Sequence, residues 1–263
     1  MDMLASILTL SGLGILFGIG LALAAKKFQV DVDPRIEKVC SILPGVNCGA
    51  CGLPGCRGFA EALVKGNCGL QRCSVSDEEA RKKIADILGI EAKAAEKQVA
   101  VLHCNGTAER VKNKFIYKGA KDCIAANLLF GGQKDCSYGC LGFGTCVAVC
   151  HFDAIKMSKE GLPVVDENKC RACNRCVEAC PKKLFSLIPL KAKVYVSCNS
   201  GDLGKGTKAV CPVGCIACKL CEKACKFDAI HVVDNLAVID YNKCTSCGEC
   251  VKVCPMKTIR MKE

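Results

Sequence analysis

The chain has 263 residues, including 26 Cys, 37 Lys or Arg and 26 Asp or Glu, with no Trp. This length allows two or three small domains, and 5% aromatic residues predict small hydrophobic cores. The formal charge of +11 suggests nucleic-acid binding, but no basic segment with interleaved aromatic residues occurs, which disfavours it. Cysteine at this density indicates disulfides or metal sites, and the many C-x2-C spacings favour metal.

A membrane-spanning helix is predicted at the N-terminus. Residues 4–25 are almost entirely apolar, and such a run can cross a bilayer core of about 30 Å as a helix. Lys26 and Lys27 follow, whereas the other flank carries only Asp2, so the positive-inside rule places the bulk of the chain in the cytoplasm. The alternative is a cleaved signal peptide, which the lack of positive charge in the first three residues and the length of the apolar run disfavour.

A small helical domain with a first metal site is predicted for residues 28–95. Helices are expected over residues 34–43, between Cys56 and Cys73, and from Asp77 to Gly89. The predicted metal ligands are Cys48, Cys51, Cys56 and Cys73. Glycines between them permit the positive φ that a loop wrapping a cluster needs. We interpret the site as a [4Fe–4S] cluster, with a Zn(Cys)4 site as the alternative.

Two cysteines of this domain, Cys40 and Cys68, lie outside the ligand pattern and are expected to be buried as small hydrophobic residues. Residues 91–98 are expected to form a helical or flexible linker. Short strands are then predicted over residues 99–104 and 114–118.

A first pair of clusters is predicted within residues 96–190. The second group of cysteines there has the C-x2-C-x2-C-x3-C-P run typical of cubane iron–sulfur ligation. That group consists of Cys170, Cys173, Cys176 and Cys180. The first group has the irregular spacing C-x3-C-x5-C-x3-C and consists of Cys136, Cys140, Cys146 and Cys150.

A second pair of clusters is predicted within residues 191–263, where both runs are regular. Their cysteines are Cys215, Cys218, Cys221, Cys225, Cys244, Cys247, Cys250 and Cys254. In such runs the fourth Cys of each ligates the cluster of the other. The predicted sets are therefore Cys215, Cys218 and Cys221 with Cys254, and Cys225 with Cys244, Cys247 and Cys250.

An internal repeat relates these two units. A shift of 75 residues brings Cys136 onto Cys211 and Cys140 onto Cys215, and Phe143 then stands in the place of Cys218. Because the first unit lacks that ligand, we expect Cys136 to supply it. The predicted sets of the first unit are Cys136, Cys140 and Cys146 with Cys180, and Cys150 with Cys170, Cys173 and Cys176.

The position of Cys211 leaves two alternatives open, since it is either spare or a ligand in place of Cys218. Cys104, Cys123 and Cys198 are also unassigned. Buried structural thiols are the first interpretation of this group, and a sixth cluster is the second. Hairpins are expected over residues 154–166 and 229–240, beside the clusters. The three histidines are not expected to be ligands.

Charge is consistent with five clusters. An oxidised [4Fe–4S] core with four thiolates carries about −2, so five of them lower the net charge from +11 to about +1. Much of the basic charge therefore offsets the clusters. No P-loop and no dinucleotide-binding glycine motif is present, so the chemistry expected of the chain is electron transfer.

The order of a membrane helix, a Pro44-Gly45-x-Asn47-Cys48 cluster segment and a ferredoxin array resembles the RnfB family over essentially the whole chain. The resemblance implies an electron-relay subunit of a cell-membrane complex that takes electrons from soluble reduced ferredoxin. Partner membrane and flavin subunits would reduce NAD⁺ and translocate Na⁺ or H⁺. The irregular segment is also similar to that of the family, which supports Cys136 as a ligand.

The sequence as a whole predicts an α+β chain with a single-pass anchor over residues 1–27, followed by the three cluster-bearing parts just described. Basic groups such as Lys169, Arg171 and Arg175 are expected to raise a cluster's potential and to attract an acidic ferredoxin. Two alternative functions are compatible with the cysteine pattern. One is the electron-transfer subunit of a related membrane reductase that acts on a redox-sensor protein, and the other is a structural zinc or thiol-storage protein.

Overall fold

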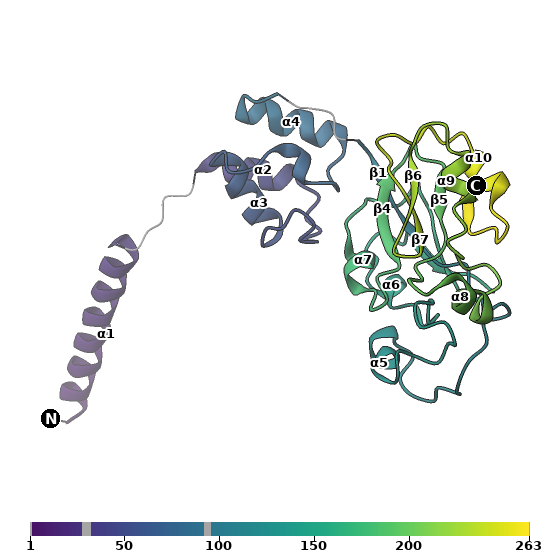
Figure 1. The fold of residues 1–263 in the computed structure, drawn as a ribbon. Coiled ribbons are helices and arrows are strands. Elements are labelled where there is room, and N and C mark those ends of the chain that lie inside the picture. The colour runs from purple at the N-terminus through teal and green to yellow at the C-terminus, as the bar shows by residue number, and fades with distance from the viewer. Residues whose placement is uncertain (1, 28–32, 92–95, 263) are drawn as a thin grey trace.

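The computed structural model describes residues 2–27, 33–91 and 96–262. Along the chain it contains a long N-terminal helix, a group of short helices, and a mixed part in which pairs of strands alternate with short helices (Figure 1). This arrangement confirms the predicted α+β class with an apolar N-terminal helix.

The first helix, α1, spans Asp2–Lys27 and includes the predicted apolar run. Its segment Ile7–Lys27 has a mean hydropathy of 2.2, and none of it is buried against the rest of the protein. Leu10 is 75% exposed and Leu21 is 72% exposed. An apolar surface of this size around a helix needs a nonaqueous environment, and its length suits a bilayer.

The helical part consists of α2 (Pro34–Ile42), α3 (Gly55–Val64), the 3₁₀ turn η1 (Leu70–Arg72) and α4 (Glu78–Leu88). Asp33 caps α2 by accepting the Arg35 backbone N–H at 2.8 Å, and Asp77 caps α4 by accepting that of Ala80 at 2.8 Å. Gly89 ends α4 with φ of 66°. The three predicted helices are therefore confirmed.

The core of this part is small and comes from all three helices. Val39 of α2, Phe59 of α3 and Ile84 of α4 are each at most 1% exposed. Cys40 and Cys68 are half-buried and pack against this core. The predicted linker over residues 91–98 lies partly outside the described residues.

The mixed part is built from antiparallel strand pairs. The pairs are β1 (Gln98–Leu102) with β4 (Phe185–Pro189), β2 (Ile155–Met157) with β3 (Pro163–Val165), β5 (Val194–Val196) with β8 (Ile259–Met261), and β6 (Ile230–Val233) with β7 (Leu236–Ile239). In each unit an outer pair joins the first and last strands and a hairpin lies between them. Both predicted hairpins are confirmed.

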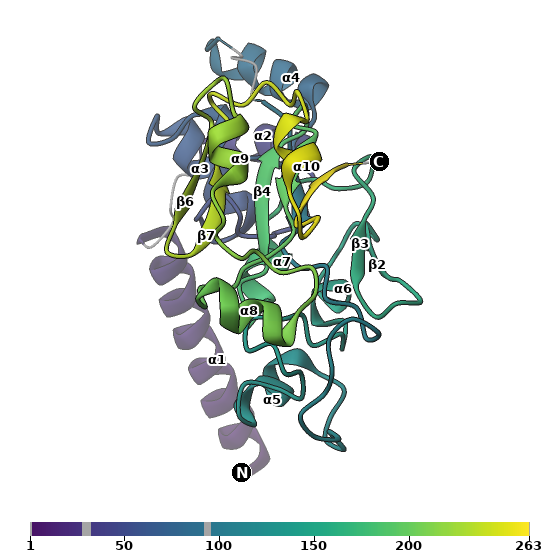
Figure 2. The ribbon, with the colours of Figure 1, turned by 45° about the vertical axis from the view of Figure 1, so that its right-hand side comes forward.

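Among the described residues of this part, six short helices lie between the strands, and five of them carry one cysteine each. They are α5 (Cys123–Leu128), α6 (Thr145–Ala148), α7 (Arg175–Ala179), α8 (Gly204–Val210), α9 (Leu220–Ala224) and α10 (Glu249–Val253). Helix α6 packs against α7 in the first unit, and α9 packs against α10 in the second (Figure 2). The internal repeat is therefore visible in the packing as well as in the sequence.

The predicted strand over residues 114–118 is wrong. Within the described residues this segment contains no strand, and the nearest pairing is an isolated bridge between Asn113 and Lys134. The segment belongs to an insertion: 32 positions separate Cys104 from Cys136, whereas 13 separate Cys198 from Cys211. The second unit has no equivalent of this insertion, so the strand pairs that the two units share leave no place for the segment.

Removing the Ile84 side chain tests the helical core. We expect Ile84→Ala to lower the free energy of unfolding of residues 33–91 by about 2–5 kcal/mol, because Ile84 is fully buried. The measurement is anaerobic urea unfolding followed by far-ultraviolet circular dichroism. Lys83→Ala, at an exposed position of the same helix, is the matched control, and equal stability of the two variants would contradict the packing.

Candidate iron–sulfur sites

Five cavities in the described structure are each lined by four cysteines. The sets are Cys48, Cys51, Cys56 and Cys73; Cys123, Cys140, Cys146 and Cys180; Cys150, Cys170, Cys173 and Cys176; Cys215, Cys218, Cys221 and Cys254; and Cys225, Cys244, Cys247 and Cys250. They are similar in size, at about 310–380 Å³ including their open mouths. The common lining and size indicate that one kind of group fits all five.

The described residues form no compact site for a single metal ion. In the described ranges, no three Cys, His, Asp or Glu side chains converge closely enough to hold one ion. Zinc binds thiolates at about 2.3 Å and draws four sulfur atoms close together. A cube with an iron at each bound corner holds its thiolates farther apart. The zinc alternative for the first site is therefore disfavoured.

A buried guanidinium nitrogen without a hydrogen-bond partner also fits an anionic cluster. Arg175 lines the cavity of Cys150, and its Nε is buried without a hydrogen-bond partner among the described residues. A buried polar group that lacks a partner is costly. A cluster with a net negative charge in the cavity would compensate the guanidinium charge.

The cysteine loops of the mixed part share one backbone conformation. The second and fourth residues after the first Cys of each loop have positive φ. They are Gly142 and Gly144, Ala172 and Asn174, Ala217 and Lys219, and Ser246 and Gly248. Alternating conformations of this kind turn successive backbone N–H groups toward one point, which forms an anion-binding concavity used in iron–sulfur sites.

A second repeated feature follows the last cysteine of three of the four runs. The sulfur accepts a backbone N–H from the residue four positions later, at 3.4 Å in each case. The donor and acceptor pairs are Leu184 and Cys180, Ala229 and Cys225, and Thr258 and Cys254. Hydrogen bonds to ligand sulfur stabilise the thiolate and tune the potential of a cluster.

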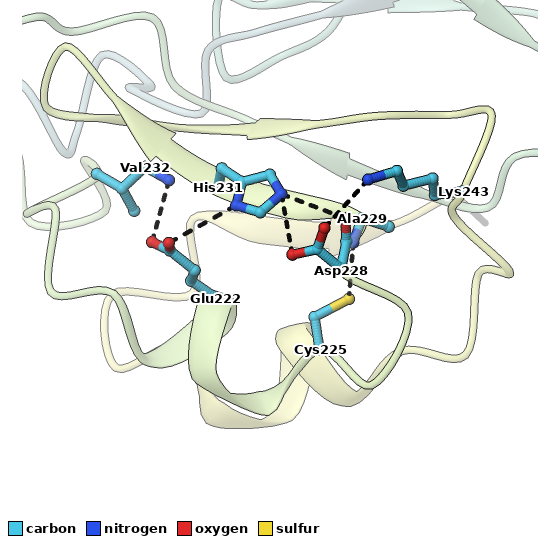
Figure 3. A network of polar contacts seen from close by, with 7 residues as sticks. All are labelled: Glu222, Cys225, Asp228, Ala229, His231, Val232 and Lys243. Carbon is cyan, nitrogen blue, oxygen red and sulfur yellow. Dashed lines mark hydrogen bonds and ion pairs between the residues drawn. The ribbon is translucent and has the colours of Figure 1, made fainter.

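Figure 3 shows how the turn after Cys225 is held in place. Asp228 has φ of 50° and forms an ion pair with Lys243 at 3.1 Å, which holds the pKa of this carboxyl below its usual range. His231 Nε2 lies 3.3 Å from the Asp228 carboxylate, and its Nδ1 lies 3.6 Å from that of Glu222 on α9. These contacts fix the turn that aims the Ala229 N–H at the sulfur.

Several of the cavity thiols are buried enough to resist ionisation on their own. Burial raises the pKa of Cys140, Cys146 and Cys176 to about 12, and that of Cys221 and Cys250 to about 11. A bound metal cluster supplies the positive charge that keeps such thiols deprotonated. Without one, these cavities would bury protonated thiols with little polar contact.

The cavity of Cys140 differs from the predicted set at one position. Its fourth thiol belongs to Cys123, and Cys136 is not among the residues that line it. Burial is the main cause of the raised pKa of Cys146, and the nearby Cys123 thiolate is the second cause. Cys123 lines this cavity because the insertion contains α5, which begins at Cys123. Cys123 thus takes the part in this cavity that Cys218 has in the second unit.

Two contacts anchor the insertion at this cavity. The Thr145 hydroxyl, at the start of α6, accepts the Cys123 backbone N–H at 2.8 Å and donates to the Asp122 carboxylate at 2.8 Å. Phe143, which stands in the place of Cys218, stacks against Tyr117 of the insertion with ring centroids 5.3 Å apart. Sequence reasoning missed Cys123 because its spacing from the other cysteines follows no known run.

In the second unit the lining of the cavity favours Cys218 over Cys211 as a ligand. Cys218 faces the cavity of Cys215, whereas Cys211 is buried elsewhere. All 26 cysteines lie in the described ranges, and only Cys218 and Cys247 among them are exposed. These two thiols mark where the cavities of the second unit come closest to solvent.

Neighbouring cavities lie next to one another. The Cys146 thiolate adds to the effect of burial on the pKa of Cys176, which lines the adjacent cavity. Cys48 of the helical part acts in the same way on the pKa of Cys173. Ser74 Oγ also donates to the Ala172 carbonyl at 3.0 Å and joins the two parts. The cavities of Cys146 and Cys176, and those of Cys48 and Cys173, are therefore neighbours.

Comparison with known families agrees with these sites. Residues 43–75 match a family described as "Putative Fe-S cluster". Residues 162–185 match a 4Fe-4S binding domain, and residues 214–258 match a 4Fe-4S dicluster domain. These family matches therefore support iron–sulfur binding and the presence of [4Fe–4S] domains independently of the structure.

Long relatives cover nearly the whole chain, and each is the B component of a membrane oxidoreductase complex. The chain is 49% identical to that of the Na(+)-translocating ferredoxin:NAD(+) oxidoreductase complex of Acetobacterium woodii, over 94% of this chain and 74% of the relative. It is 43% identical to that of the ion-translocating oxidoreductase complex of Methanosarcina acetivorans, over 98% and 97%. It is 41% identical to that of the proton-translocating ferredoxin:NAD(+) oxidoreductase complex of Clostridium ljungdahlii, over 94% and 88%.

Removal of the Thr145 hydroxyl tests how Cys123 is positioned. We expect Thr145→Val to weaken the anchoring of α5 by about 1–3 kcal/mol, because the Cys123 N–H and the Asp122 carboxylate lose their partner. Iron should then be lost from this cavity first when the anaerobic protein is titrated with a chelator. Thr145→Ser, which keeps the hydroxyl, should behave as the wild type. Equal iron loss from both variants would refute the role of the hydroxyl.

Proposed function

The chain belongs to the RnfB family of ion-translocating oxidoreductase complexes, and on this basis we propose that it relays electrons from soluble reduced ferredoxin to its membrane and flavin partners. Those partners would reduce NAD⁺ and move Na⁺ or H⁺. The chain is thus an electron-transfer component of an oxidoreductase. The observation that carries this function is the set of adjacent four-cysteine cavities.

We propose that the cysteines lining the five cavities ligate [4Fe–4S] clusters, with Cys123 in the set for which Cys136 was predicted. Each cluster supplies one-electron transfer when bound. The chain's own residues hold the cavities apart from water, donate N–H groups to sulfur, and place basic groups such as Arg171 and Arg175 at the cavity walls. Positive charge beside a cluster favours the reduced state, which carries the additional electron.

We also propose that ferredoxin docks on the second unit. The exposed thiols Cys218 and Cys247 belong to this unit, so a partner can approach its cavities most closely. Exposed lysines surround the first of them, at Lys219, Lys223 and Lys226. These charges suit an acidic partner, since complementary charge accelerates association.

The helical part would then pass electrons to the membrane partners. It directly follows α1 in the chain, and it contacts the first unit through Ser74 and Ala172. In this arrangement α1 is a single-pass anchor in the cell membrane, and the rest of the chain lies on the cytoplasmic side because Lys26 and Lys27 end the helix.

Charge reversal on the second unit tests the docking site. We expect the triple variant Lys219→Glu, Lys223→Glu and Lys226→Glu to slow reduction by ferredoxin about tenfold or more at low salt, because electrostatic steering is lost. The rate is read from the loss of visible cluster absorbance in stopped flow. The control reverses three exposed lysines of the first unit, Lys118, Lys121 and Lys159. Equal slowing in the control would place docking elsewhere.

Protease accessibility tests the topology. In sealed inverted vesicles, which expose the cytoplasmic face, trypsin should digest residues 33–262, whereas right-side-out vesicles should protect them until detergent is added. The reason is the basic flank of α1. Digestion in right-side-out vesicles would contradict the proposed orientation.

A further inference from the structure

The insertion between Cys104 and Cys136 carries an apolar surface that takes no part in the cavities. Phe130 is 87% exposed, Ile116 is 85% exposed and Leu128 is 82% exposed, each more than any large apolar side chain described in α1. Exposed apolar groups that lie together mark a surface that binds a protein or a membrane. We call the following four residues the apolar tip: Ile116, Leu128, Leu129 and Phe130.

Helix α5 presents an apolar outer face beside this tip. Its inner side carries Cys123, which lines the cavity of Cys140, and Ala126, which is fully buried. Ile124 and Leu128 are four residues apart, so they share one face of the helix, and both are exposed. A helix at a water-exposed surface normally places polar residues on that face. The outer face of α5 therefore extends the apolar tip.

Hydrogen bonds hold the apolar tip in place. Lys114 Nζ donates to the Phe130 carbonyl at 2.8 Å, and the Lys114 backbone N–H donates to the Gln133 carbonyl at 2.8 Å. Gln133 is buried, and its side chain donates to the carbonyl of Leu141, at the wall of the Cys140 cavity, at 3.0 Å. Phe130 has φ of 49°, a conformation that bulky residues rarely adopt. The folded loop itself therefore keeps Phe130 exposed.

The charges around the apolar tip are mainly basic. Residues 105–135 contain six Lys or Arg and three Asp or Glu. Lys182 reaches the tip from the first unit, since a Cβ at Gly131 would lie 3.2 Å from its Nζ. Exposed lysines of the insertion are Lys114, Lys118 and Lys121. Within the described residues none of these four lysines forms an ion pair, so their charges suit an anionic surface.

Two features favour a lipid surface over a protein as the occupant of the apolar tip. Protein interfaces are enriched in Arg and depleted in Lys, whereas the charges beside this tip belong to lysines. The apolar stem of a lysine can lie along a membrane while its ammonium group reaches the headgroups. The second feature is α1, whose length and composition suit a bilayer, so that lipid lies within reach of the chain.

We propose that the apolar tip inserts into the surface of an anionic bilayer, with Leu128 and Phe130 below the headgroups and the flanking lysines bound to lipid phosphates. The tip is then a membrane contact in addition to α1.

This contact would orient the mixed part of the chain. In both Figure 1 and Figure 2, α5 lies at the opposite end of the mixed part from α9 and α10. A bilayer bound at the α5 end leaves the second unit turned away from the lipid and open to soluble ferredoxin. The orienting role rests on the proposed ferredoxin docking, whereas the lipid contact itself does not.

Photocrosslinking of the full chain tests the contact. The residue p-benzoylphenylalanine replaces Phe130, and the anaerobic protein is reconstituted in nanodiscs of phosphatidylcholine and phosphatidylglycerol. We expect lipid adducts on the peptide with this probe, at about five times the yield from a probe at Val253 of α10, which is also exposed. Equal yields at the two positions, or no adduct at Phe130, would overturn the contact. The yield does not depend on electron transfer, so this failure would leave the proposed function intact.

The same probe distinguishes lipid from a protein occupant. In native membranes that contain the partner proteins, light should again attach lipid at Phe130. Adducts with a partner protein in place of lipid would overturn the proposal and assign the tip to a protein interface.

Charge reversal tests the flanking lysines. We expect the double variant Lys118→Glu and Lys121→Glu to lower the yield of lipid adducts at Phe130 about threefold or more, because attraction to the anionic lipid is lost. The control is Lys159→Glu, at an exposed position of the first unit outside the insertion, and it should keep the yield. An equal loss in the control, or an unchanged yield in the double variant, would refute binding of these lysines to lipid phosphates.

Discussion

Four thiolates that surround one anionic group are the constraint on which the rest of this structure depends. Thiols crowded in a weakly polar cavity are hard to ionise, as the raised pKa of Cys140, Cys146 and Cys176 indicates. Three features of the fold stabilise thiolates. They are a loop in which residues of positive and negative φ alternate, backbone N–H groups that donate to sulfur, and basic side chains at the cavity walls. Cluster binding would add folding free energy, which fits hydrophobic cores as small as these.

The same constraint explains how the two units differ. The second unit keeps the regular loop, with Cys218 at its centre. The first unit has Phe143 there and keeps the backbone conformation through Gly142 and Gly144. Its missing thiol comes from an insertion that is tied to α6 by Thr145 and to Phe143 by Tyr117. A ligand has therefore been replaced without a change in the loop around it.

Much of this organisation could be predicted from sequence, since short regular spacings and apolar runs are local signals. The runs at Cys170 and Cys244 identified their cavities, and Asp33, Asp77 and Gly89 marked helix ends that the structure confirms. Cys123 could not be predicted, because only the tertiary path of the insertion brings it to Cys146.

The account rests on iron in the five cysteine cavities. X-ray diffraction from anaerobic crystals, recorded on both sides of the iron absorption edge, tests it most directly. We predict an anomalous iron signal in every one of the five four-cysteine cavities. Cavities that hold zinc, disulfides or no metal at all would contradict it.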